Sequence, residues 1–169
     1  MHTKAGQQRQ HRREERIAKA FNEQGISFDR EFTVQFCGEA NQKCARVDFV
    51  LYRQFGTILL EVDEFEHAHY GVTCETARML DILGEQIKQQ NRSGKIHIIR
   101  LNIDSYSEQG VEQHTSIKDR IVTLLQTIEK EPVLQYSVTY LYYSRTDSPL
   151  PDTCLDPEYP GTLRAIVNF

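Results

Sequence analysis

The sequence predicts an α/β fold, a mixed α+β sheet with helices packed on it, in the element order αβββαβαβ. Three β-like runs follow one another between residues 31 and 63 with only short polar connections, which indicates a meander. A helical pattern then separates the third run from the isoleucine-rich run 95–101. Strands joined through a helix normally pair in parallel, so the sheet should contain both strand directions.

Composition places the chain among globular proteins. Its 169 residues are predicted to form one domain, with 39% apolar and 26% charged residues. No apolar run approaches the roughly 20 residues that span a bilayer, so no membrane partner is expected. The four cysteines form no C-x-x-C pair, and the N-terminus has no apolar signal core. Reduced thiols and an intracellular location follow, with cytoplasm or nucleus left open and a Cys37–Cys44 hairpin disulfide as the alternative.

The chain is expected to divide into a disordered basic leader over 1–11, a folded domain over 12–144 and a Pro-rich extension over 145–169 that packs on the domain or trails it. The formal net charge of −4 does not favour nucleic acid. Basic residues nevertheless outnumber acids between residues 4 and 19, a pattern found in nucleic-acid binders. A solvated helix surface is the other interpretation.

Each early element has a local signal. Residues 12–24 are predicted to form the first helix, because apolar side chains recur at helical spacing and Gly25 follows as a stop. Residues 31–36 alternate apolar and polar side chains, as in a half-buried strand. The second strand covers 45–53 and the third covers 57–63, whose continuous apolar run is typical of a central strand.

The later elements follow the same logic. They are a helix over 75–91, a strand over 95–101, a helix over 116–129 and a strand over 134–144. Ser116 and Asp119 resemble a capping box at the start of the last helix, and Pro132 ends it. Residues 145–159 hold three prolines and several acids and are predicted to be mostly loop.

Acidic residues gather where the third strand ends, and His67 follows them. Glu61 and Asp63 lie two apart and should share a face of that strand. Asp48 on the neighbouring strand would come close to both, beside the carbonyl of Val62. Hard oxygen ligands of this kind suit Mg²⁺ or Mn²⁺. The alternatives are a structural ion pair of Asp48 and Glu61 with Arg46 or Arg100, and an exposed turn for His67.

Five strings carry a family resemblance that extends over residues 12–106; two of them, ETARMLDIL and IIRLNIDSY, resemble segments of related viral and phage proteins. EERIAKAFNEQGISF, RVDFVL and ILLEVDEFEH resemble the opening helix, the Asp-bearing strand and the acidic strand of the PD-(D/E)XK, restriction-endonuclease-like nucleases. The similarity points to the branch that contains the very-short-patch repair endonuclease and the EDxHD homing endonucleases. Two positions depart from the signature, because Val47 replaces its proline and Asp63 replaces its lysine.

The resemblance implies a division of roles among the polar residues. Asp48 and Glu61 would bind metal, with Asp63 as a ligand or next to one, and the Val62 carbonyl beside them. His67 would activate or orient water, which gains weight because the lysine is missing. Glu14 on the opening helix, with Glu15 as the neighbouring option, would hold a metal-bound water. The remaining polar positions of interest are Arg78 and Arg100, which could neutralise the scissile phosphate, and Asp104.

The expected function is therefore a Mg²⁺-dependent (or Mn²⁺-dependent) endonuclease that hydrolyses DNA phosphodiester bonds. DNA is the expected partner, with a homodimer or an additional DNA-binding domain supplying affinity that the acidic net charge does not. One alternative is a catalytically inactive nuclease-fold protein that binds nucleic acid or serves a structural role, as the missing lysine suggests. Another is a hydrolase that acts on RNA or on a different phosphoester.

Overall fold

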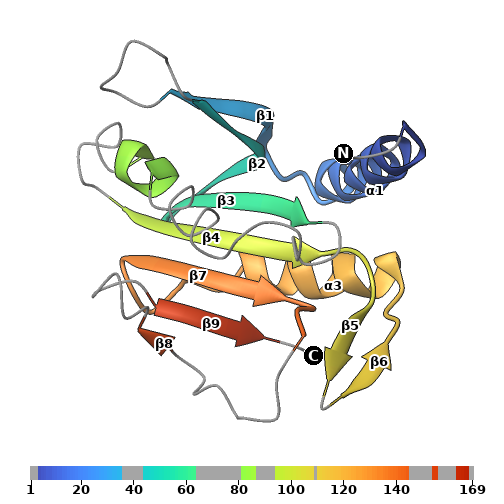
Figure 1. Ribbon diagram of the computed structural model, residues 1–169. Helices are drawn as coiled ribbons and strands as arrows, with labels where there is room; N and C mark the ends of the chain where they lie inside the picture. Colours follow the sequence, from blue (N-terminus) through green and yellow to red (C-terminus); the bar gives the residue numbers. More distant parts are fainter. Residues whose placement is uncertain are drawn as a thin grey trace.

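The computed structural model describes residues 4–35, 44–63, 81–86, 94–108, 110–144, 154–155 and 163–167 (Figure 1). Its elements are α1 (Lys4–Glu23), β1 (Phe28–Gln35), β2 (Cys44–Arg53), β3 (Gly56–Asp63), β4 (Lys95–Asn102), β5 (Tyr106–Glu108), β6 (Val111–Gln113), α3 (Ile117–Ile128), β7 (Tyr136–Leu141), β8 (Cys154–Leu155) and β9 (Leu163–Val167). Residues 81–86, between β3 and β4, are also helical.

One mixed sheet organises the chain. Its seven strands lie in the order β1-β2-β3-β4-β7-β9-β8, and β5 pairs with β6 in a separate hairpin. β1, β2 and β3 are antiparallel neighbours, whereas β4 runs parallel to β3 and β7 runs parallel to β4. The predicted class, the three-strand meander and the parallel pairing after a helix are therefore confirmed.

The two faces of the sheet bury different side chains. On one face, residues of α1 and α3 such as Phe21 and Leu124 pack against Phe49 and Leu60; we call this the α1 face. On the other face, Ile82 of the helical segment packs with alternate strand residues, and we call this the 81–86 face. Consecutive residues of β3 are buried on both faces, which is why the sequence shows a continuous apolar run there.

Three differences from the expected elements have local causes. α1 begins at Lys4 instead of near residue 12, because residues 4–11 consist mainly of Gln, Lys, Arg and Ala, which favour a helix even without an apolar stripe. The three-residue strands of the β5–β6 hairpin are too short to show a period of two. Within the extension 145–169, β9 adds to the sheet parallel to β7, so this segment packs on the domain.

The turn between β2 and β3 depends on a glycine. Gly56 has φ of +150°, and a Cβ placed there would lie 1.9 Å from the carbonyl oxygen of Lys95. The backbones of β3 and β4 can approach this closely only because glycine has no side chain. In the described part of the chain, no helix is long and apolar enough to cross a membrane.

Candidate metal centre

The ladder between β2 and β3 stops at Asp48. Paired residues run from Arg53 and Gly56 as far as Phe49 and Leu60, and β2 then remains paired only with β1. The Asp48 Oδ2 atom accepts a hydrogen bond from the Val62 backbone N–H at 2.7 Å. In Figure 1 the first half of β2 rises away from β3 together with β1. This hydrogen bond of the Asp48 carboxylate thus connects β2 to β3 at the point where the two strands separate.

Glu61 lies beside this point. One step beyond the pair Phe49 and Leu60, the antiparallel register sets Asp48 next to Glu61. Val50 and Leu59, their neighbours two residues along, belong to the cluster on the 81–86 face. Because side chains alternate along a strand, Glu61 projects to that same face; at Asp48 the alternation of β2 is interrupted, since Val47 belongs to the 81–86 face and Phe49 to the α1 face. Glu61 is buried, with 6% of its surface exposed.

The Val62 carbonyl shares the edge of β3 that faces Asp48. The N–H and C=O groups of one strand residue point to the same neighbour, and the Val62 N–H points to Asp48. The predicted grouping of Asp48, Glu61 and the Val62 carbonyl is therefore consistent with the strand geometry.

Asp63 forms a buried ion pair with Arg100. The Arg100 Nε atom donates to Oδ2 at 2.7 Å, and Nη2 donates to Oδ1 at 2.8 Å. The Tyr143 hydroxyl also donates to Oδ2. The two charged side chains are only 3% and 1% exposed, so water hardly screens the pair. An ion pair with Arg100 was expected as an alternative for Asp48 and Glu61, and the structure shows it at Asp63.

Glu14 lies on α1, whose apolar residues pack on the α1 face. Its carboxylate is 3.7 Å from Arg30 Nη2 on β1. Burial raises the pKa of Glu14 above its usual value, and the nearby Arg30 opposes that shift. Among the described residues, no three His, Cys, Asp or Glu side chains are grouped closely enough to hold a metal ion. His67 and Arg78 lie outside the described residues, as does Cys37.

These contacts decide which of the expected ligands fit a divalent ion. Mg²⁺ needs only one or two carboxylates and keeps several waters, and Asp48 with Glu61 supplies that number. Asp63 does not fit as a ligand, because both of its oxygens already accept hydrogen bonds from Arg100.

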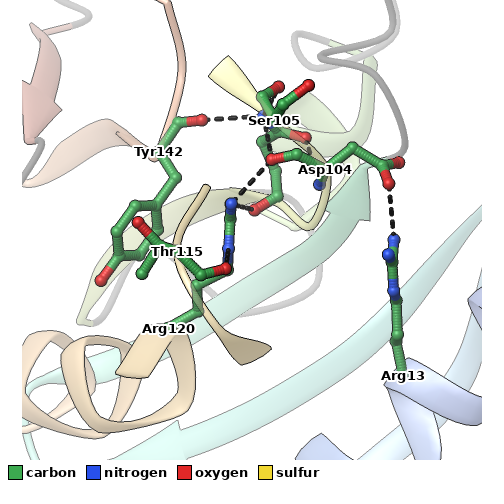
Figure 2. A network of polar contacts seen from close by, with 7 residues as sticks. Arg13, Asp104, Ser105, Thr115, Arg120 and Tyr142 are labelled. Atoms are coloured by element: carbon green, nitrogen blue, oxygen red, sulfur yellow. Dashed lines mark hydrogen bonds and ion pairs between the residues drawn. The ribbon is translucent and has the colours of Figure 1, made fainter. Parts of the chain in front are cut away.

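A second polar network, which the sequence did not indicate, lies on the α1 face (Figure 2). Arg120 of α3 is 1% exposed and donates to three backbone carbonyls, those of Asn102, Asp104 and Thr115. Its guanidinium carbon lies 4.7 Å from the ring centroid of Tyr142. Burial lowers the pKa of Arg120, and the neighbouring tyrosines and Asp104 oppose that shift. The network fixes the segment that leaves β4.

Asp104 connects this network to α1. Its Oδ1 atom accepts a hydrogen bond from Arg13 Nη1 at 2.9 Å, as Figure 2 shows. The Asn102 side chain accepts from the Asp104 backbone N–H at 3.0 Å and donates to the Tyr142 carbonyl at 2.8 Å. Asp104, a position of interest from the resemblance, thus joins α1 to the ends of β4 and β7.

Comparisons of this chain with protein-family models, with curated proteins and with solved structures found no match. The resemblance to restriction-endonuclease-like nucleases therefore continues to rest on the five strings of the sequence.

Proposed function

We propose that this chain is a metal-dependent endonuclease that hydrolyses DNA phosphodiester bonds on a restriction-endonuclease-like fold. The observation that carries the proposal is the juxtaposition of Asp48 and Glu61 where β2 leaves β3. A β1–β2–β3 meander followed by a helix and the parallel strand β4 is the element order expected from the resemblance, and it supports the same conclusion.

In this proposal Asp48 and Glu61 would hold Mg²⁺ or Mn²⁺. A bound metal of this kind supplies an activated water and stabilises charge on a phosphate oxygen. The hydrogen bond from the Val62 N–H fixes the orientation of Asp48, so its second oxygen is directed without loss of conformational freedom on binding. Arg100 lies beside Glu61 in the register of β3 and β4 and limits the repulsion between neighbouring carboxylates. His67 stays the proposed residue that activates or orients water.

DNA is the proposed substrate because cations follow α1. Arg16 and Lys19 are exposed on α1 and, with Lys118 of α3, line one groove between the two helices. In Figure 1 the start of α1 lies beyond the ends of β3 and β4, where the candidate carboxylates are found. These cations are the proposed phosphate contacts, which would make binding sensitive to salt.

Cleavage of supercoiled plasmid tests the proposal. The wild-type chain should nick or linearise the plasmid with Mg²⁺ or Mn²⁺ and not with EDTA, and Asp48→Asn and Glu61→Gln should each remove the activity. Asp29→Asn is the matched control, because it alters an exposed carboxylate of β1 whose contact is the Tyr52 hydroxyl. Cleavage that survives both site variants would overturn the assignment. Competition by an RNA duplex would indicate the wider phosphoester alternative.

A nuclease-fold protein that binds DNA without cutting it is the second candidate. The observation that favours it is the use of Asp63, at the signature's lysine position, in an ion pair with Arg100. This candidate expects DNA binding in EDTA equal to that in Mg²⁺, no cleavage with either metal, and no change in binding for Asp48→Asn. Fluorescence anisotropy with a labelled duplex separates the two candidates.

A further inference from the structure

Tyr142, directly after β7, has a backbone conformation that is unusual for a large side chain. Its φ is +61°, in the left-handed region where the Cβ atom crowds the backbone. Such conformations persist when surrounding contacts enforce them, and they are frequent at functional sites. The strain of this backbone conformation at Tyr142 must therefore be offset by contacts elsewhere in the structure.

The consequence of this conformation is a reversal of side-chain alternation at the end of β7. Val138 and Tyr140 belong to the 81–86 face, and Leu141 belongs to the α1 face. Regular alternation would send Tyr142 to the 81–86 face and Tyr143 to the α1 face. The structure shows the opposite, because Tyr142 packs with Leu141 on the α1 face and Tyr143 packs with Tyr140 on the other. The positive φ thus delivers the Tyr143 hydroxyl to Asp63.

Several contacts hold Tyr142 in this conformation. Its carbonyl accepts a hydrogen bond from the Asn102 amide at 2.8 Å, and its hydroxyl lies 2.6 Å from Thr123 Oγ1. The guanidinium of Arg120 covers its ring. The buried network of Figure 2 therefore has an effect across the sheet, since it maintains the turn that aims Tyr143.

We infer that Tyr143 is a positioning residue of the proposed metal site. It acts with Arg100 on Asp63 and thereby fixes the end of β3 that carries Glu61. Three donors converge on the Asp63 carboxylate, from β4 and from the end of β7. In the strand register Arg100 lies opposite Glu61, so a shift of the pair would move the neighbouring carboxylate. The inference rests on the proposed function, because it concerns the same site.

The chemistry of Tyr143 suits this role. Burial is the main cause that raises the pKa of Tyr143 far above its usual value, and the adjacent Asp63 raises it further. The hydroxyl therefore stays protonated and remains a donor throughout the physiological range. Its ring is fixed as well, in an edge-to-face contact with Tyr140 at a centroid distance of 5.0 Å.

The test is Tyr143→Phe, which removes one oxygen atom and keeps the ring. Mn²⁺ binding to the full chain is measured by electron paramagnetic resonance, and plasmid cleavage is measured against Mg²⁺ concentration. Partners that orient a metal ligand typically matter by 10–100-fold, so we expect metal affinity to fall about tenfold. Cleavage at saturating metal should change less than about threefold, since the reacting groups remain.

Tyr52→Phe is the matched control. It removes a 2.8 Å hydrogen bond from a tyrosine to Asp29 on the exposed surface, and it should alter neither measurement. Arg100→Lys is a second variant that keeps the charge but loses the two-point contact, and it should also weaken Mn²⁺ binding. Circular dichroism confirms that each variant is folded. If Tyr143→Phe does not fold, Arg100→Lys decides the question by the same criterion.

The outcomes separate this inference from the proposed function. Metal affinity that is unchanged in Tyr143→Phe, with or without a lower melting temperature, overturns the positioning role. A wild-type chain that binds Mn²⁺ through Asp48 but cuts no DNA overturns the endonuclease, while the binding measurements still decide the role of Tyr143. A wild-type chain that neither binds Mn²⁺ nor cuts overturns both.

Discussion

Replacing Asp63 with Asn would leave the Arg100 guanidinium buried without its anionic partner. The side chains of Asp63 and Arg100 are 1% and 3% exposed and are joined by two hydrogen bonds of 2.7 and 2.8 Å, so water hardly weakens their interaction. Breaking such a pair costs about 3–5 kcal/mol in the free energy of unfolding. By contrast, Asp48→Asn keeps an oxygen that can accept from the Val62 N–H and should cost no more than about 1 kcal/mol.

Urea denaturation at pH 7, followed by circular dichroism, measures these differences. The double variant Asp63→Leu with Arg100→Met removes both charges and should recover most of the loss, with a coupling energy of about 2–3 kcal/mol in a double-mutant cycle. Glu31→Gln is the control, because it breaks an ion pair with Arg46 whose side chains are 61% and 67% exposed, and it should cost less than about 0.5 kcal/mol. A cost for Asp63→Asn as small as that of the control would refute the reasoning.

Three further predictions address the fold and the partner. His97 is buried, its Nε2 lies 2.7 Å from Thr139 Oγ1, and burial lowers its pKa to about 4. The unfolded chain therefore binds the proton more tightly than the folded chain does. The free energy of unfolding should be at its full value above about pH 6.5 and fall by roughly 3 kcal/mol by about pH 4. His97→Gln should lose this part of the acid dependence in urea titrations at several pH values, and an unchanged pH profile would contradict it. Gly56→Ala should lower the unfolding free energy by about 2–4 kcal/mol, because its Cβ would meet the Lys95 carbonyl at 1.9 Å. The control is Gly110→Ala, because Gly110 also has a positive φ but has open space around it. Equal melting temperatures for the two variants would contradict the steric cause. Arg16→Ala should reduce the slope of log affinity for duplex DNA against log salt concentration by about 1. Lys130→Ala, just beyond the end of α3, should leave that slope unchanged. Equal slopes for the two variants would exclude binding of DNA along α1.

Much of the fold follows from local sequence patterns. Alternation in β1 and β2 and the apolar run of β3 were sufficient for the meander, and the helical spacing before Lys95 was sufficient for the parallel strand β4. The Ser116 cap is confirmed, since its hydroxyl accepts from the Asp119 N–H at 3.2 Å. These features depend on residues within a few positions of one another, and the spacing of apolar residues along the sequence can indicate such local structure.

The candidate site was only partly predictable. The expected proximity of Asp48 and Glu61 follows from the register of two adjacent strands, whose paired residues end one step before them, at Phe49 and Leu60. The contact of Arg100 with Asp63 depends on side-chain reach across a parallel register, which no pattern specifies. Tyr143 was missed because its position requires the reversal of alternation at Tyr142, and a simple period of two places it on the wrong face.

The Arg120 network had no sequence signal for a different reason. Its acceptors are backbone carbonyls of Asn102, Asp104 and Thr115, and every residue type has a carbonyl. A buried arginine on an apolar helix face is visible in the sequence only as an interruption of the stripe. Its tyrosine partners lie 14 and 22 residues away along the chain, in separate elements.

The most direct test of the metal site is anomalous diffraction from crystals of the full chain soaked in Mn²⁺. We expect one manganese peak in contact with Asp48 and Glu61, while Asp63 keeps both hydrogen bonds to Arg100. A soak without a peak between Asp48 and Glu61, or a peak bound by Asp63 after Arg100 has moved away, would contradict the account.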